Sequence, residues 1–219
     1  MDTRYRTASR KTTYLGLAIA LMGIWASSRL LSVVFGAETI WLDFLKELVR
    51  LGLWALLLWM VVAKERLPLR SIGWGTSPLW KSLAWGVAGF LLSALAGGVG
   101  FLLDVPLHLH FTLPGDDTPL WFGTLIALVA GIVEETFFRG YAMERIKTLT
   151  GSTLLAWLLP LGVFASLHLY LGWAGVLNAF CMGLVMAALY WWRRDLLGNM
   201  ISHALVDLTF VVLFPWLAR

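Results

Sequence analysis

Residues 119–140, PLWFGTLIALVAGIVEETFFRG, are apolar over a length that can cross a bilayer, yet three charged residues stand near their end. A helix needs about 20 residues to span the hydrocarbon core. A charged side chain near the bilayer centre costs roughly 3 kcal/mol, and less when it is paired or close to an interface. Glu134, Glu135 and Arg139 therefore require either a packing reason or a chemical one.

The composition of the whole chain is that of an integral membrane protein. Of its 219 residues, 59% are hydrophobic and 14% are charged, and the mean hydropathy is +0.78. A soluble domain carries about a quarter charged residues, so a soluble enzyme is excluded and the lipid bilayer is an expected partner. The single cysteine, Cys181, excludes an internal disulfide.

Apolar segments of spanning length recur along the chain without a Pro- or Ser-rich linker or a clear internal repeat. We therefore predict an all-α, polytopic transmembrane helical bundle in one structural unit. The second segment is the least apolar, because its first turns contain four charged residues. The seven predicted spans are 14–36, 41–63, 79–103, 119–140, 153–171, 173–192 and 197–217.

The basic residues gather on one predicted side of the membrane. Four precede the first span, four lie between the second and third, three follow the fourth and two follow the sixth, so 13 of the 17 lie on this side. Lys and Arg are enriched in cytosolic loops. The net charge of +4 follows from this bias and does not indicate nucleic acid. We expect a multi-pass protein of the cell membrane with a cytosolic N-terminus. The residues counted are Arg4, Arg6, Arg10, Lys11, Lys64, Arg66, Arg70, Lys81, Arg139, Arg145, Lys147, Arg193 and Arg194.

The two adjacent glutamates point in different directions, because successive residues of an α-helix are about 100° apart. Glu135 and Arg139 stand four residues apart with the acid first, which favours an ion pair on one helix face. Glu134 then remains as the unpaired carboxylate. Such a group, partly removed from water, can act as a general base near neutral pH. An ion-pair cluster that only fixes helix packing explains this segment about equally well.

Histidines occur in two further predicted spans. His168 lies four residues after Phe164 in FASLH, and Asp207 lies four residues after His203 in HALVD. A carboxylate beside a histidine fixes the tautomer and orientation of the ring. Taken singly, each histidine is equally well or better explained by a hydrogen bond between helices.

Three predicted helices thus bring proton-handling groups into apolar surroundings, where isolated groups are costly. We therefore expect Glu134, His168 and His203 to converge on one polar cavity near the cytosolic side. By helix rise, Glu134 and His203 lie about 10 Å from that face, whereas His168 lies about 24 Å along its helix. This difference predicts that the helix of His168 is tilted, is broken near Pro160, or ends in a turn at 169–173 that dips into the membrane.

EETFFR, FASLH and HALVD resemble the motifs Glu-Glu-x-x-x-Arg, Phe-x-x-x-His and His-x-x-x-Asn/Asp of the CPBP family. This family comprises CAAX-processing and bacteriocin-processing intramembrane endopeptidases, including the CAAX prenyl protease 2 enzymes. The motifs stand in the family's order and approximate spacing, and the resemblance covers about 119–215. We therefore separate residues 1–118, with three spans and no motif, from a CPBP-like catalytic core of four spans at 119–219.

The resemblance implies a role for each matching residue. Glu134 corresponds to the catalytic base, which acts with His168 to activate a water for attack on a peptide carbonyl. Glu135 and Arg139 correspond to positions that brace the site, and Phe164 opens the second motif.

His203 and Asp207 correspond to the pair near the oxyanion, where hydrogen-bond donors stabilise charge that develops in the transition state. The eukaryotic enzymes have Asn at the position of Asp207, and an ionised Asp cannot donate a hydrogen bond. Asp207 would instead orient His203 and favour its protonated form, or be protonated itself. Two histidines and nearby carboxylates are also able to bind zinc. The resemblance favours a metal-free, glutamate-dependent mechanism, so we expect no cofactor and keep zinc as the alternative.

Other chemistries find less support. HExxH and GxSG, which mark other intramembrane proteases, are missing from the sequence. His108 and His110, with Asp104, form a candidate outer metal site that a solvated loop explains better. A proton-coupled transporter or a non-catalytic scaffold would use similar residues. However, the chain is short, shows no repeated halves and retains every motif residue.

The expected partner is a membrane-associated peptide or protein substrate, such as a prenylated C-terminal peptide or a leader peptide.

Overall fold

The computed structural model describes residues 9–36, 39–107 and 118–213, and every regular element within these ranges is a helix. The predicted all-α class is therefore confirmed. The longer helices are α1 (Arg10–Phe35), α2 (Ile40–Trp59), α3 (Leu79–Leu107), α4 (Leu120–Glu134), α6 (Thr153–Ser166), α7 (Gly172–Arg193) and α8 (Leu196–Asp207). The shorter ones are the π-helices η2 (Met60–Lys64), η4 (Glu135–Met143) and η6 (Leu208–Leu213), the 3-10 helices η3 (Leu69–Ile72) and η5 (Leu167–Leu171), and α5 (Glu144–Thr150).

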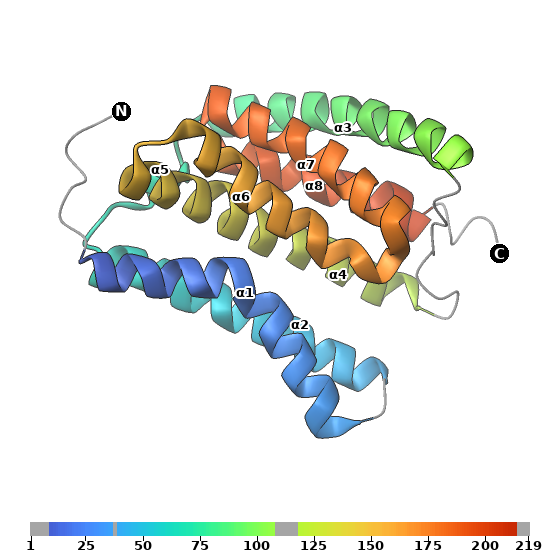
Figure 1. Ribbon diagram of the computed structural model, residues 1–219, viewed down its shortest axis with the longest axis horizontal. Coiled ribbons are helices and arrows are strands. Elements are labelled where there is room, and N and C mark those ends of the chain that lie inside the picture. Colours follow the sequence, from blue (N-terminus) through green and yellow to red (C-terminus); the bar gives the residue numbers. More distant parts are fainter. Residues whose placement is uncertain (1–8, 37–38, 108–117, 214–219) are drawn as a thin grey trace.

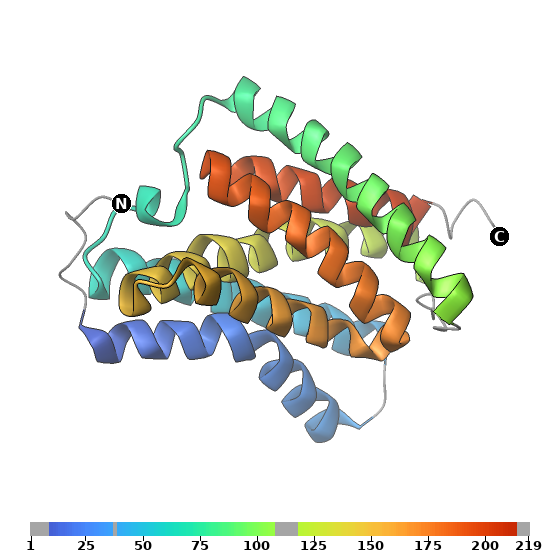
Figure 2. The ribbon, with the colours of Figure 1, turned by 45° about the horizontal axis from the view of Figure 1, so that its top comes forward.

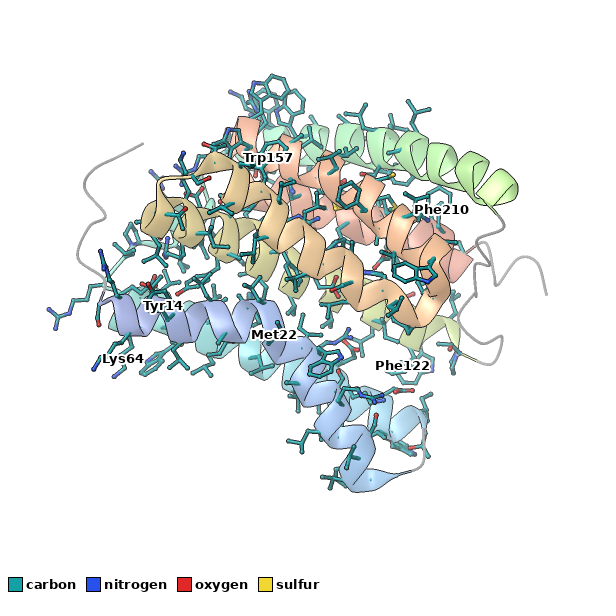
Figure 3. All side chains as sticks on the ribbon, viewed as in Figure 1. Tyr14, Met22, Lys64, Phe122, Trp157 and Phe210 are labelled. Carbon is teal, nitrogen blue, oxygen red and sulfur yellow. The ribbon has the colours of Figure 1, made fainter. Side chains whose placement is uncertain are left out.

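The helix that carries both glutamates lies at the centre of the bundle. α4, η4 and α5 follow one another without a break from Leu120 to Thr150. They pack against the α1–α2 hairpin on one side and against α6 and α8 on the other (Figure 1). α3 is outermost and packs on α7 and α8 (Figures 1 and 2). Tyr14 and Lys64 lie at one end of the bundle, and Phe122 and Phe210 at the other (Figure 3).

Each predicted span falls on a helix, but four continuous helical segments are long and apolar enough to cross a membrane. The longest, Thr153–Arg193, contains two of the predicted spans. The helical run Leu196–Phe210 is apolar but shorter, and α2 does not qualify as a span. Length and composition therefore support a membrane-spanning bundle with four candidate spans, and they do not confirm the predicted count of seven. The four candidates are Arg10–Phe35, Leu79–Gly98, Leu120–Thr150 and Thr153–Arg193.

The outer helix α3 presents apolar side chains to its surroundings. Seven large side chains spaced along its described part are exposed, a pattern that suits contact with lipid rather than water. On the opposite side, an added Cβ at Gly89 would lie 2.8 Å from the Ser202 hydroxyl oxygen, so α3 and α8 approach closely. Small residues at such contacts are typical of membrane helices. The exposed residues are Leu79, Trp80, Leu83, Val87, Leu91, Leu92 and Leu95.

The central helix is longer than predicted, which corrects the expected depths. We predicted its end at residue 140, but η4 and α5 extend it to Thr150. By helix rise, Glu134 then lies about 24 Å from Thr150, rather than about 10 Å from the helix end. His168 lies about 23 Å from the start of α6, so the predicted difference in depth between the two residues disappears. α6 also passes through Pro160 without a break.

Two basic residues that we assigned to a cytosolic loop are buried inside this helix. Arg139 and Arg145 are 2% and 4% exposed, and removing them from the 13 loop residues leaves 11. The Arg145 guanidinium lies 2.8 Å from the Glu65 carboxylate. Tyr141 donates a hydrogen bond of 2.7 Å to the same carboxylate, and Arg145 donates one of 3.0 Å to the Ser71 hydroxyl. This buried cluster fastens the segment between α2 and α3 to the central helix.

α4 and α8 meet at Gly131. An added Cβ at this position would lie 2.9 Å from the Met200 carbonyl oxygen and 3.1 Å from the Ala204 amide nitrogen. Both are backbone atoms, so one helix would have to move to make room. This close approach brings the next turn of α4 beside His203.

We predict that Gly131→Ala lowers the thermal midpoint of the purified protein, because overpacking at a backbone contact costs about 1 to 3 kcal/mol. Gly162→Ala is the matched control, since an added Cβ there meets no atom within 4 Å. The control should leave stability unchanged or raise it slightly. Equal midpoints for the two variants would contradict the close contact between α4 and α8.

Candidate active site

A fully buried carboxylate, Glu135, accepts three hydrogen bonds. Its Oε1 lies 2.8 Å from Nη1 of Arg139 and 2.8 Å from Nδ1 of His203, and Oε2 accepts a bond of 3.0 Å from the Asn199 side-chain amide. Glu135 is 0% exposed. The predicted ion pair between Glu135 and Arg139 is therefore confirmed, and it is joined by two residues of α8.

Arg139 and Asn199 carry this network to two further helices. Arg139 donates through Nη2 to the Gly183 carbonyl of α7 at 3.1 Å, and its guanidinium carbon lies 4.3 Å from the ring centre of Phe164 in α6. Asn199 also donates to the Met186 carbonyl of α7 at 2.8 Å. The buried charges are thus paired and hydrogen-bonded, as a dry interior requires. The network fixes η4, α6, α7 and α8 relative to one another.

Asn199 is the member of this network that the sequence analysis missed. It stands four residues before His203, which in turn stands four before Asp207, so the three form one stripe along α8. The spacing was visible in the sequence. Asn199 was overlooked because an amide at a helix start has many local explanations.

His203 lies between two carboxylates. Its Nδ1 bonds to Glu135, and its Nε2 lies 3.6 Å from Oδ2 of Asp207. The second distance is too long for a hydrogen bond but is within ion-pair range. The predicted pairing of His203 with Asp207 is therefore confirmed as a contact of opposite charges when the ring is protonated.

His168 is linked to His203 by Phe164, whose ring lies close to both histidines. The Phe164 ring centre lies 4.9 Å from that of His168 and 6.0 Å from that of His203. Nδ1 of His168 donates to the Phe164 carbonyl oxygen at 2.9 Å. Because a carbonyl only accepts, this bond places the proton on Nδ1 and leaves Nε2 of a neutral ring free to accept one. His168 belongs to η5, an irregular segment at the position where the sequence predicted a turn.

Glu134 differs from its neighbour in having no ion pair or hydrogen bond from its side chain within the described ranges. Its side chain is half-buried, and its charge interacts with those of His203 and Asp207. The charge of His168 also interacts with that of Asp207. The four residues assigned to catalysis thus belong to one electrostatic cluster, in which Glu134 is the carboxylate without a fixed partner.

A zinc site needs three or four closely placed His, Cys, Asp or Glu donors. In the part of the chain that the structure describes, no three His, Cys, Asp or Glu side chains are placed to hold a metal ion. The outer candidates His108 and His110 lie outside the described residues. We therefore derive no catalytic step through a metal.

The candidate residues coincide with a family match. Residues 116–209 match the family described as type II CAAX prenyl endopeptidase Rce1-like. This match spans every residue from Glu134 to Asp207, and it confirms the resemblance to the CPBP and CAAX proteases. No curated protein and no solved structure matches the chain. The match covers less than half of the chain and shows what this segment is similar to, while the four apolar helices support an integral membrane protein.

We predict that Arg139→Met strongly destabilises the protein, because it leaves the Glu135 charge buried without its cation. Breaking a buried pair in this way costs about 3 to 5 kcal/mol. Arg194→Met is the control, since its pair with Glu144 is 42% exposed on the arginine side and such pairs contribute about 1 kcal/mol or less. Thermal midpoints in detergent measure both. Similar losses would show that the Glu135 network does not organise the bundle.

Proposed function

Because residues 116–209 carry the signature of the CAAX-type endopeptidase family, we propose that the protein is an intramembrane endopeptidase with Glu134 as its general base. The observation that carries this proposal is the contrast between the two adjacent glutamates. Glu135 is saturated with hydrogen bonds, while Glu134 is half-buried, has no partner among the described residues and interacts through its charge with His203. A base must be free to take up a proton, and of the two glutamates only Glu134 meets this condition.

In the proposed reaction, Glu134 accepts a proton from a water molecule, and the resulting hydroxide attacks the carbonyl carbon of the scissile peptide bond. Nε2 of His168 accepts the second hydrogen bond of this water and orients it. The tetrahedral intermediate collapses when Glu134 returns the proton to the leaving amine. Water and peptide are thereby converted into a carboxylic acid and an amine, which become a carboxylate and an ammonium by proton exchange at neutral pH, and Glu134 is regenerated.

His203 supports the developing oxyanion. Its ring is held rigidly because Nδ1 bonds to a carboxylate that Arg139 and Asn199 themselves fix. Asp207 beside Nε2 favours the protonated ring, which then presents positive charge to the site. Charge held in place before the reaction stabilises the transition state without reorganisation. Asp207 thus acts through His203, and an Asn at this position is not required.

The substrate in this proposal is a membrane-associated peptide or protein, either CAAX-like at its C-terminus or a leader peptide. In this proposal the chain crosses the cell membrane seven times, with the end of the bundle near Tyr14 and Lys64 (Figure 3) in the cytosol, because basic residues are enriched in cytosolic loops. The active site, about 24 Å from that end by helix rise, is open toward the cytosolic side. The rival functions, a proton-coupled transporter or a scaffold, predict no cleavage.

We predict that Glu134→Gln and His168→Ala each reduce peptide cleavage by about 100-fold or more, the usual contribution of general acid–base groups. Both variants should keep the thermal midpoint of the wild type. Glu144→Gln is the matched control, because Glu144 pairs with Arg194 at the end of the bundle and should retain activity. The readout is cleavage of a lipidated test peptide by purified protein. Full activity in both site variants would rule out this mechanism.

We further predict that a strong zinc chelator leaves the rate of cleavage unchanged, because Glu134 and His168 activate water without a metal. Elemental analysis of the purified protein should find zinc well below one equivalent. Loss of activity on chelation, restored by added zinc, would show that the reaction is metal-dependent.

A further inference from the structure

A charged stripe on α2 lies next to the site, although α2 is outside the matched segment. Asp43 pairs with Lys46 at 3.0 Å, and Glu47 pairs with Arg50 at 3.1 Å. Arg50 stands near the middle of this 20-residue helix, which is a membrane span only in the proposed seven-span topology, and a charged side chain is most costly at that depth. Replacing a buried ion pair by apolar residues is often neutral or stabilising, so packing alone does not account for it.

The position of α2 is fixed by a hydrogen bond to the central helix. Nε1 of Trp54 donates to the hydroxyl of Thr136 at 3.0 Å. Arg50 lies one helical turn before Trp54, and Glu134 lies two residues before Thr136. The charge of Glu134 interacts with that of Glu47, and both Glu134 and Arg50 interact with Tyr170. The stripe on α2 and the proposed base therefore face the same region.

Arg50 has an unused hydrogen-bonding edge. Its Nη1 binds Glu47, but its Nε is buried and has no hydrogen-bond partner among the described residues. A guanidinium offers five N–H donors, and the edge formed by Nε and one terminal nitrogen matches a carboxylate in a bidentate pair. An orphaned buried donor costs free energy that a ligand can recover. The edge suits a planar anion such as a carboxylate.

We propose that Arg50 binds the free C-terminal carboxylate of the substrate and so selects peptide bonds a few residues from a chain end. This inference rests on the proposed function and names the substrate feature that the site recognises. Three residues follow the cysteine of a CaaX sequence, and in extended form they span about 10 Å. Packed helix axes are also about 10 Å apart. The length of this tail therefore matches the separation of two neighbouring helices such as α4, with Glu134, and α2, with Arg50, which are in contact.

The test compares two peptides that differ only at the C-terminus. The probes are an S-farnesyl heptapeptide ending in a CaaX sequence, as the free acid and as the C-terminal amide. Wild-type full-length protein should cleave the acid with a kcat/KM at least about tenfold higher, a ratio equivalent to about 1.4 kcal/mol. Arg50→Gln should reduce cleavage of the acid to the rate of the amide and leave the amide unchanged.

Two controls separate recognition from structure. Arg29→Gln removes an exposed arginine of α1 and should preserve the preference for the acid. Arg50→Lys keeps the charge but loses the bidentate edge, and it should show an intermediate preference. It also replaces Arg50→Gln if that variant does not fold. Equal cleavage of acid and amide by the wild type, or a uniform loss on both peptides in Arg50→Gln, would overturn the proposal.

A binding measurement distinguishes failure of this inference from failure of the proposed function. Fluorescence anisotropy of the labelled acid and amide with Glu134→Gln protein requires no catalysis. The acid should bind about tenfold more tightly than the amide, and the difference should vanish in the double variant with Arg50→Gln. If neither peptide is cleaved by the wild type but the acid still binds more tightly, the assigned chemistry is wrong and the carboxylate site stands. Equal binding overturns the carboxylate site.

Discussion

A carboxylate buried in the middle of a helical bundle must find all its hydrogen bonds within the protein, and Glu135 imposes this requirement on the whole core. Its partners come from its own helix and from α8. Arg139 then extends the network to α6 and α7. Because an unpaired charge at this position is far more costly than any single apolar contact, four helices are held in one relative arrangement.

This network also explains why the two adjacent glutamates differ in their surroundings. Glu135 points into the core and is fully engaged, whereas Glu134 lies half-buried on an adjacent face, without a partner in the described part of the chain. The Phe164 ring lies against both histidines, so the rigid core places them around the same region. The second buried cluster, of Glu65 with Tyr141 and Arg145, fixes the far end of the same helix. The side chain of Glu134, the proposed base, is thus unpaired among the described residues, while the buried clusters around Glu135 and Glu65 hold the helix that carries it in place.

Among the first three helices, α2 and the segment that follows it make specific contacts with the central helix of the matched segment. Trp54 bonds to Thr136 beside the glutamates, and the charges of α2 face the proposed base. The segment after α2 is joined to the central helix by Glu65. In the proposed function, the motif residues supply the reacting groups, and α2 supplies Arg50, which we assign to the C-terminal carboxylate of the substrate.

Local spacing determined much of this protein. Apolar segments of spanning length indicated an all-helical membrane bundle, and separations of four residues indicated the pairs of Glu135 with Arg139 and of His203 with Asp207. Only the tertiary structure showed that the central helix continues to Thr150, and that Asn199 and His203 complete the bonds of Glu135. Helical periodicity fixes which residues share a face of one helix. It does not fix how two helices are rotated and how closely they approach, which depends on contacts such as the one at Gly131.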